Sequence, residues 1–134
     1  PEHPNCIAPH KRPYHTIIPC MATRGGDLAL CFGVMGGFMQ PQGHLQVLSN
    51  IVDHGMTPQG ALDAPRFFYQ EENAYLIEPG LPDGMYASLR QRGHDLTVAS
   101  DGGYGGGQVI MVHPESGALM CGSEPRKDGC AVAF

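Results

Sequence analysis

The segment spanning residues 34–55 constrains the fold more than any other part of the chain, because two adjacent glycines join an apolar run to an amphipathic one. The apolar run at residues 28–35 is typical of a buried strand. After Gly36 and Gly37, apolar residues recur at three-to-four spacing as far as Gly55, which is typical of a helix that packs on one face and stops at a glycine. The segment therefore predicts a strand, a tight turn and a helix.

The glycine pair in this turn has two interpretations. Glycine turns without a Cβ penalty and leaves its N–H groups open beside a helix N-terminus, whose unpaired donors and dipole favour negative charge. Gly36 and Gly37 then indicate a site for an anion, which could be a phosphate, a carboxylate or the oxyanion that forms when an acyl carbonyl is attacked. The alternative is a plain strand-to-helix turn in which glycine only relieves crowding.

The rest of the chain predicts hairpins around a helical middle. A β-branched run at residues 15–22 and a glycine turn at residues 23–27 precede the apolar strand. Thr57 caps a short helix that ends before Pro65, and residues 82–92 form a third helix. Further strands are expected at residues 75–78, 96–98, 109–113, 118–122 and 130–134, with a change of direction at 66–70. This order predicts an α+β fold, a mainly antiparallel sheet with helices on one side.

Glycine is also dense at residues 101–107, and this stretch leads into a strand. Because it lacks the lysine and hydroxyl residue of a phosphate-binding loop, we expect a mobile loop or a close approach of two backbones, and no nucleotide site.

Composition excludes several classes of protein. At 134 residues, 42% of them hydrophobic and 16% charged, the chain fits one folded domain. A net charge of -5 with scattered basic residues argues against nucleic-acid binding, and no apolar run approaches the ~20 residues of a membrane span. Five cysteines without a CxxC pair favour a reducing compartment, hence the cytoplasm over the periplasm or secretion. Seven histidines without ligand spacing predict no metal, and no cofactor is expected.

The first residues differ from the remainder. Residues 1–13 contain four prolines and are expected to form an extended arm, with the folded part at residues 14–134. The chain begins at Pro1 without an initiator methionine, so we expect it to be a processed or excised part of a longer protein.

Five motifs resemble the γ-glutamyltranspeptidase family in their order and spacing. They are KRPYHTIIP (11–19), GGFMQPQGHLQVLSNIVDHGM (36–56), ALDAPRF (61–67), RGH (92–94) and EPRKDGCAVAF (124–134). Members of this family are N-terminal-nucleophile hydrolases that process themselves into a large and a small subunit. The resemblance identifies residues 14–134 as the C-terminal part of the small subunit, and it implies part of an αββα sandwich.

The resemblance also assigns roles to residues. In the family, the new N-terminal threonine of the small subunit attacks a γ-glutamyl amide and uses its own α-amine as the base. Gly36 and Gly37 match the glycine pair of the oxyanion hole. His15 and Thr16 stand where the family has a serine pair that binds the substrate carboxylate, and Thr16 keeps a hydroxyl. No threonine-led segment precedes Lys11, so no nucleophile is expected on this chain and the chain alone is expected to be inactive.

The expected function is therefore a part of an amide-bond hydrolase or γ-glutamyl transferase of glutathione metabolism. Expected partners are a γ-glutamyl amide or related acyl substrate, the large subunit and the remainder of the small subunit. Without those parts a sheet face or edge of this chain would be uncovered. A homodimer through residues 28–35, or through 109–113 and 118–122, is therefore also expected. The alternatives are a cephalosporin-acylase-like amidase, a non-catalytic binding or assembly module of the same fold, and a stand-alone anion-binding domain.

Overall fold

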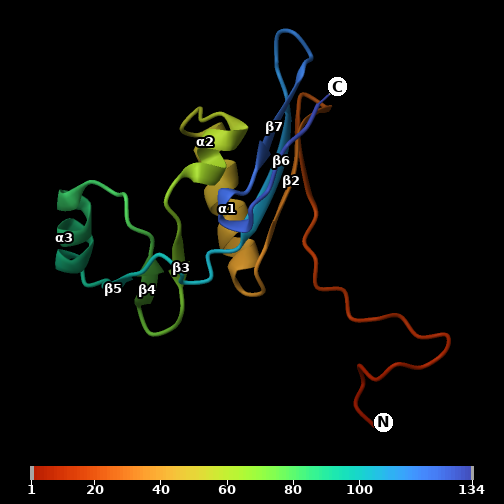
Figure 1. Cartoon of the computed structure of the whole chain (residues 1–134), viewed down its shortest axis with the longest axis horizontal. Helices are drawn as coiled ribbons and strands as arrows, with labels where there is room; N and C mark the ends of the chain where they lie inside the picture. The colour runs from red at the N-terminus through yellow and green to blue at the C-terminus, as the bar shows by residue number, and fades with distance from the viewer. Residues whose placement is uncertain (1, 134) are drawn as a thin grey trace.

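The computed structural model describes residues 2–133, and its elements alternate between hairpins and helices (Figure 1). The strands are β1 (Cys20–Arg24), β2 (Asp27–Met35), β3 (Phe67–Tyr69), β4 (Ala74–Ile77), β5 (Asp95–Val98), β6 (Gly106–Val112) and β7 (Leu119–Ser123). The helices are α1 (Met39–Val52), α2 (Pro58–Asp63) and α3 (Asp83–Gln91), and a 3₁₀ turn η1 (Pro125–Lys127) follows β7. This content confirms the predicted α+β class.

The larger sheet has four antiparallel strands in the order β1-β2-β6-β7. Along β2, the side chains of Leu30, Phe32 and Val34 are 3%, 5% and 2% exposed, and they alternate with less buried neighbours. Since successive side chains of a strand point to opposite faces, one face of the sheet carries the core. The predicted hairpin and buried strand are therefore confirmed, but the first arm of the hairpin begins at Cys20, after Pro19, and not at residue 15.

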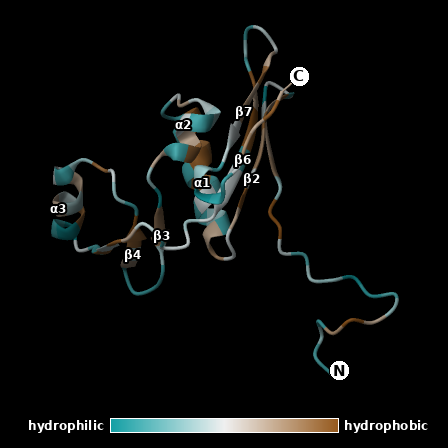
Figure 2. Cartoon of the chain, viewed as in Figure 1, coloured by the Kyte–Doolittle hydropathy of each residue, from teal (hydrophilic) through white to brown (hydrophobic). Residues whose placement is uncertain are grey.

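Helices α1 and α2 cover this face of the sheet (Figures 1 and 2). Val47 and Ile51 of α1 pack with the buried side chains of β2 and with Leu62 of α2. Gly43 lets α1 approach β2 closely, because a Cβ on Gly43 would lie 2.6 Å from Cγ1 of Val34. None of the helices within residues 2–133 is long and apolar enough to cross a membrane.

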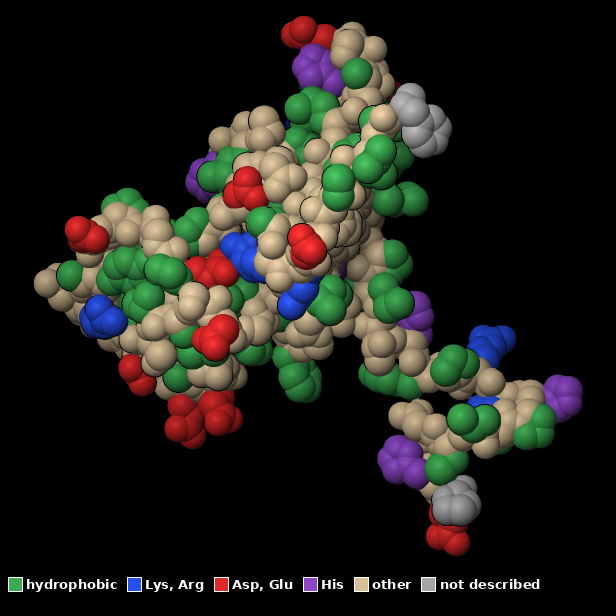
Figure 3. All heavy atoms as spheres, in the orientation of Figure 1, with side chains coloured by type: hydrophobic (Ala, Val, Ile, Leu, Met, Phe, Trp, Pro, Cys, Tyr) green, Lys and Arg blue, Asp and Glu red, His purple; other side chains and the backbone are tan. Residues whose placement is uncertain are grey.

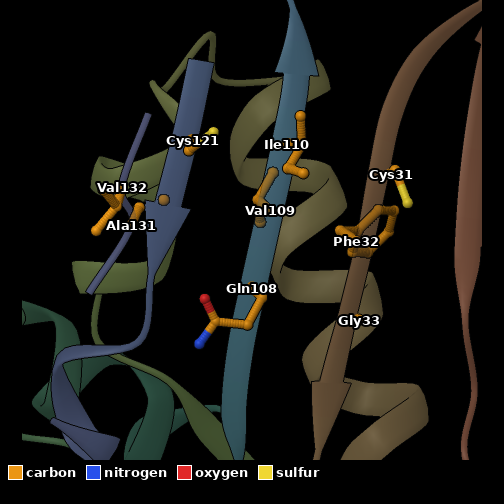
Figure 4. Close-up of a pocket in the computed structure, with 10 residues that line it drawn as sticks. Cys31, Phe32, Gly33, Gln108, Val109, Ile110, Cys121, Ala131 and Val132 are labelled. Atoms are coloured by element: carbon orange, nitrogen blue, oxygen red, sulfur yellow. The ribbon is translucent and has the colours of Figure 1, made fainter. Parts of the chain in front are cut away.

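The opposite face of the four-stranded sheet, which we call the open face, carries no helix within residues 2–133. A row of side chains crosses all four strands on it, because Met21 pairs with Cys31, Cys31 with Ile110, and Ile110 with Cys121. Met21 and Ile110 are 71% and 44% exposed. Figure 4 views this face with α1 and α2 behind the sheet, and Val132 borders its shallow hollow of about 360 Å³. In Figure 3 hydrophobic side chains lie along this side of the molecule.

The second sheet has three strands in the order β3-β4-β5, and the sequence did not predict it as a separate sheet. Strands β3 and β4 are antiparallel, whereas β4 and β5 are parallel and joined through α3. The interpretation of residues 66–70 as a mere change of direction was wrong, because Phe67–Tyr69 pairs with β4. Three residues are too few to show the period of a strand.

The ends of the chain carry no regular elements in the described range. Residues 2–19 contain no helix or strand, and their first part stands away from the body in Figures 1 and 3. The strand predicted at residues 130–134 is absent from residues 130–133, and residue 134 lies outside the described residues. The ladder ends at Ser123, and Asp128 after η1 has a positive φ of 52°.

Candidate functional site

The turn at Gly36 and Gly37 lies between β2 and α1, as the sequence predicts. Both glycines have positive φ, 134° and 59°. Their carbonyl oxygens accept hydrogen bonds from the N–H groups of Met39 and Gln40 at 3.0 and 3.1 Å, which starts the helix. Within residues 2–133, none of the hydrogen bonds outside the helix and strand ladders has the Gly36 or Gly37 N–H as its donor.

The first turn of α1 supplies no negative charge of its own. Phe38 occupies the N-cap position without a capping side-chain hydrogen bond, and the first turn contains no acidic residue. The unpaired N–H groups and the dipole of the helix therefore meet no carboxylate from this turn. An anion at this helix end would experience a favourable field.

Gly36 also packs against the glycine-rich loop that precedes β6. A Cβ on Gly36 would lie 2.9 Å from Cα of Gly105, so neither backbone leaves room for a side chain there. Of the two expectations for residues 101–107, the close backbone approach therefore holds at Gly105. Gly37 differs, because a Cβ on it would meet no atom within 4 Å.

The segment of Thr16 reaches the glycine turn through one side chain of α1. The Gln40 side-chain amide donates to the Thr16 carbonyl at 2.8 Å and to the Gly37 carbonyl at 3.3 Å. The structure thus brings the backbone of Thr16 beside the turn. The side chains of His15 and Thr16 are exposed and make no hydrogen bonds with other residues in the 2–133 range.

A buried ion-pair network, which the sequence reasoning missed, lies behind the glycine-rich loop. Arg66 Nη2 lies 2.8 Å from Glu124 Oε2, and Arg126 Nη1 lies 2.6 Å from Glu124 Oε1. Arg126 also donates from Nε and Nη2 to the two oxygens of Glu78, at 2.6 and 2.5 Å. Arg66 and Glu124 are 1% and 0% exposed. Their charges are therefore paired in a dry environment, where removing one partner is costly.

The network shifts the pKa values of its members in opposite directions. Burial alone would raise the pKa of the Glu124 carboxyl, but the hydrogen bonds from Arg126 and from the Gly107 N–H, with the Arg66 charge, hold it below its ordinary value. Burial lowers the pKa of Arg66, and Glu124 partly offsets this effect. Burial opposes the charge of Arg126, yet its hydrogen bonds to Glu78 and Glu124 raise its pKa.

The same network fixes the loop that supports the turn. Arg66 Nη1 donates to the Tyr104 carbonyl at 3.0 Å, and the Gly107 N–H donates to Glu124 Oε2 at 2.6 Å. The Tyr104 hydroxyl donates to the Ala99 carbonyl at 2.8 Å, and burial with the nearby Glu78 charge raises the pKa of Tyr104 to about 12. Gly105, which touches Gly36, lies between these anchored residues. The network therefore acts as a support and leaves no unpaired carboxylate for chemistry.

Glu78 is 8% exposed and binds Arg126, which lies 48 residues away in sequence. The Glu78 carboxylate also accepts from the Arg66 N–H at 2.8 Å. No local spacing could therefore reveal the ion pair with Arg126. The residues 2–133 contain no group of three or more His, Cys, Asp or Glu side chains that could hold a metal ion.

The comparisons with known proteins identify relatives of the whole chain. The family model described as gamma-glutamyltranspeptidase matches residues 1–134. A glutathione hydrolase-like proenzyme of Bacillus subtilis, YwrD, is 33% identical over 138 residues, which cover 98% of this chain and 26% of that protein. The chain thus spans about a quarter of the length of the curated relatives that head the comparison.

Solved structures share the fold over the whole chain. A cephalosporin acylase from Bacillus halodurans is 47% identical, with a TM-score of 0.85 over 100% of this chain and 25% of that one. A gamma-glutamyltranspeptidase from Pseudomonas nitroreducens is 27% identical, with a TM-score of 0.77 over 100% of this chain and 70% of that one. These neighbours are N-terminal-nucleophile hydrolases, and the chain belongs to the gamma-glutamyltranspeptidase family.

Proposed function

We propose that this chain supplies the oxyanion-binding turn and part of the substrate-carboxylate site of an amide hydrolase or γ-glutamyl transferase. The observation that carries this proposal is the turn at Gly36 and Gly37. Within residues 2–133 the N–H groups of these glycines donate none of the turn hydrogen bonds, and the helix N-terminus beside them has no side-chain cap. Thr16 beside this turn supports the second part of the proposal. Family membership supports the reaction class.

The proposed reaction proceeds through an acyl intermediate. A threonine hydroxyl from outside this chain attacks the amide carbonyl carbon, and its proton passes to the α-amine of the same threonine. The carbonyl oxygen becomes an oxyanion, which the N–H groups of Gly36 and Gly37 stabilise. The amine then leaves with a proton, and water or an acceptor amine releases the acyl group from the threonine ester.

The proposed substrate carries a carboxylate beyond its acyl chain. Thr16 offers a hydroxyl that can donate to this carboxylate, and His15 offers a ring nitrogen in place of a smaller donor. Two substrate classes follow, γ-glutamyl amides and other carboxylated acyl amides. The 47% identity to a cephalosporin acylase is the reason for keeping the second class as an alternative to γ-glutamyl amides.

The proposed whole protein includes partners for this chain. The chain spans about a quarter of its curated relatives, which supports the proposal that a large subunit and the remainder of the small subunit complete the site. A second copy of the chain is the proposed partner of the open face when those parts are absent.

The test compares two amides in the full-length protein, γ-glutamyl-p-nitroanilide and glutaryl-p-nitroanilide, which share the terminal carboxylate and differ in the α-amine. We expect turnover of at least one of them and a covalent acyl-enzyme on a threonine by mass spectrometry, whereas the 134-residue chain alone releases no p-nitroaniline. Absence of turnover and of the adduct in the full-length protein would favour the non-catalytic module. Turnover by the chain alone would contradict the proposal that the nucleophilic threonine lies outside this chain.

A further inference from the structure

Helix α1 holds extended backbone on two sides through side chains at four-residue spacing. On one side, Gln42 accepts from the Tyr69 N–H at 2.8 Å and donates to the Tyr69 carbonyl at 3.1 Å. Gln46 makes the same pair of contacts with Phe67, at 3.0 and 2.9 Å. Each glutamine amide thus replaces the backbone of a neighbouring strand for one residue of β3.

This pairing works because the two spacings match. Four residues of a helix rise about 6 Å, and two residues of a strand span about 6.6 Å. Gln42 and Gln46 can therefore meet Tyr69 and Phe67 without distortion of either element.

On the other side, Gln40 and His44, also four residues apart, contact the backbone of the segment at residues 16–18. The Gln40 amide donates to the Thr16 carbonyl at 2.8 Å and accepts from the Ile18 N–H at 3.2 Å. His44 Nε2 lies 2.8 Å from the Ile18 carbonyl, and Nδ1 lies 2.6 Å from the Gln40 carbonyl. His44 is 8% exposed, and its ring packs on Phe32 with centroids 5.4 Å apart.

These contacts connect the segment to the glycine turn. Residues 14–19 belong to neither sheet, so no strand ladder holds Thr16 in place. The Gln40 amide that binds the Thr16 carbonyl also reaches the Gly37 carbonyl at 3.3 Å. A buried histidine one helical turn further on fixes the other end of the segment at Ile18.

We propose that Gln40 and His44 are positioning residues that set the distance between the Thr16 segment and the Gly36–Gly37 turn, and thereby the fit of a carboxylated acyl group. This inference rests on the proposed function. Gln40 and His44 touch no reacting atom in it; they act through Thr16 and Gly37. Gln42 and Gln46 have the same chemistry on the same helix, but they hold β3. Gln42 also donates to the Phe38 carbonyl at 3.4 Å, and within residues 2–133 neither glutamine side chain hydrogen-bonds Gly36 or Gly37.

The test uses Gln40→Met in the full-length protein, with Gln42→Met as the matched control. Both changes remove two hydrogen bonds to a neighbouring segment and one to the backbone just before α1, at Gly37 or Phe38, so both lower the melting temperature. We expect Gln40→Met to raise KM for glutaryl-p-nitroanilide by about tenfold, the loss of two ordinary hydrogen bonds, with a smaller change in kcat. KM for butyryl-p-nitroanilide, which lacks the carboxylate, stays the same. His44→Gln, which can still reach one carbonyl, gives an intermediate KM.

Equal KM values in Gln40→Met and the unaltered protein, or an equal rise in Gln42→Met, would overturn the proposal. Hydrogen exchange gives a readout that needs no activity: Gln40→Met speeds exchange at the Ile18 amide, and Gln42→Met speeds it at the Tyr69 amide. If the unaltered protein turns over none of the amides, the proposed function fails. Slow Ile18 exchange that Gln40→Met does not change would then separately refute the hold on the segment.

Discussion

At the scale of single residues, Gly36 and Gly37 need glycine for different reasons. Gly36 has no room for a side chain, because a Cβ would lie 2.9 Å from Gly105 Cα and 3.2 Å from Met39 Cβ. Gly37 has room, but its φ of 59° is one that a β-branched residue rarely adopts. A substitution at Gly37 therefore changes the direction of its N–H group more than it disturbs the packing of the core.

This difference makes Gly37 the better position for testing the oxyanion role. We expect Gly37→Val in the full-length enzyme to lower kcat by ~100-fold, the effect of losing one donor to the oxyanion. Gly25→Val is the matched control, because Gly25 has φ 63° and also has open space around it, but lies in the β1–β2 turn. Similar losses of stability with turnover lost only in Gly37→Val would support the role. An unchanged rate in Gly37→Val would remove this N–H from the mechanism.

At the scale of elements, the ion-pair network joins the two sheets and the turn η1. Glu78 follows β4 of the smaller sheet, Glu124 follows β7 of the larger one, and Arg126 of η1 binds both. Arg126 also donates to the carbonyls of Leu62 and Ala64 at the end of α2, at 2.6 and 3.0 Å. Ion pairs and hydrogen bonds therefore connect β4, β7 and η1 to the end of α2.

The Glu124 carboxyl makes this connection sensitive to acid. Its pKa in the folded protein lies below the ordinary value of 4.5, so the unfolded chain takes up the proton first as the pH falls. The contribution of Glu124 is complete above about pH 4.5 and is lost progressively below it. We expect Glu124→Gln to lower the free energy of unfolding at neutral pH by about 3–5 kcal/mol. The variant should also lose less stability than the unaltered protein as the pH falls. Melting temperatures against pH for this variant and for the exposed Glu115→Gln, which keeps the profile unchanged, supply the check.

The same comparison of elements shows what the sequence could predict. The hairpin, the glycine turn, α1 and the Thr57 cap depend on residues close in sequence, and the structure confirms them, including the bond from the Gly60 N–H to Thr57 Oγ1 at 3.1 Å. The smaller sheet and the ion-pair network depend on pairs far apart in the chain, such as Arg66 with Glu124. Local period and spacing carry no signal for these pairs. The glutamines of α1 were visible in QPQGHLQ, but their partners were not.

At the scale of the whole molecule, the open face is an apolar surface that no helix within residues 2–133 covers. Its row of Met21, Cys31, Ile110 and Cys121 crosses the sheet without a covering layer, while the helices occupy the other face. The family's αββα sandwich implies that another sheet covers such a face in the complete protein. Apolar area of this kind seldom stays exposed on an isolated monomer.

For the chain expressed by itself, we therefore expect a dimer that buries the open face of each copy. Ile110→Lys places a charge in the middle of the row and should shift the dimer to monomer. Val98→Lys is the control, because Val98 is 43% exposed, Ile110 is 44% exposed, and Val98 lies on the smaller sheet. Sedimentation velocity at micromolar concentration distinguishes the species. A monomer in the unaltered chain, or a dimer that survives Ile110→Lys and dissociates in Val98→Lys, would show that a second copy does not cover this face.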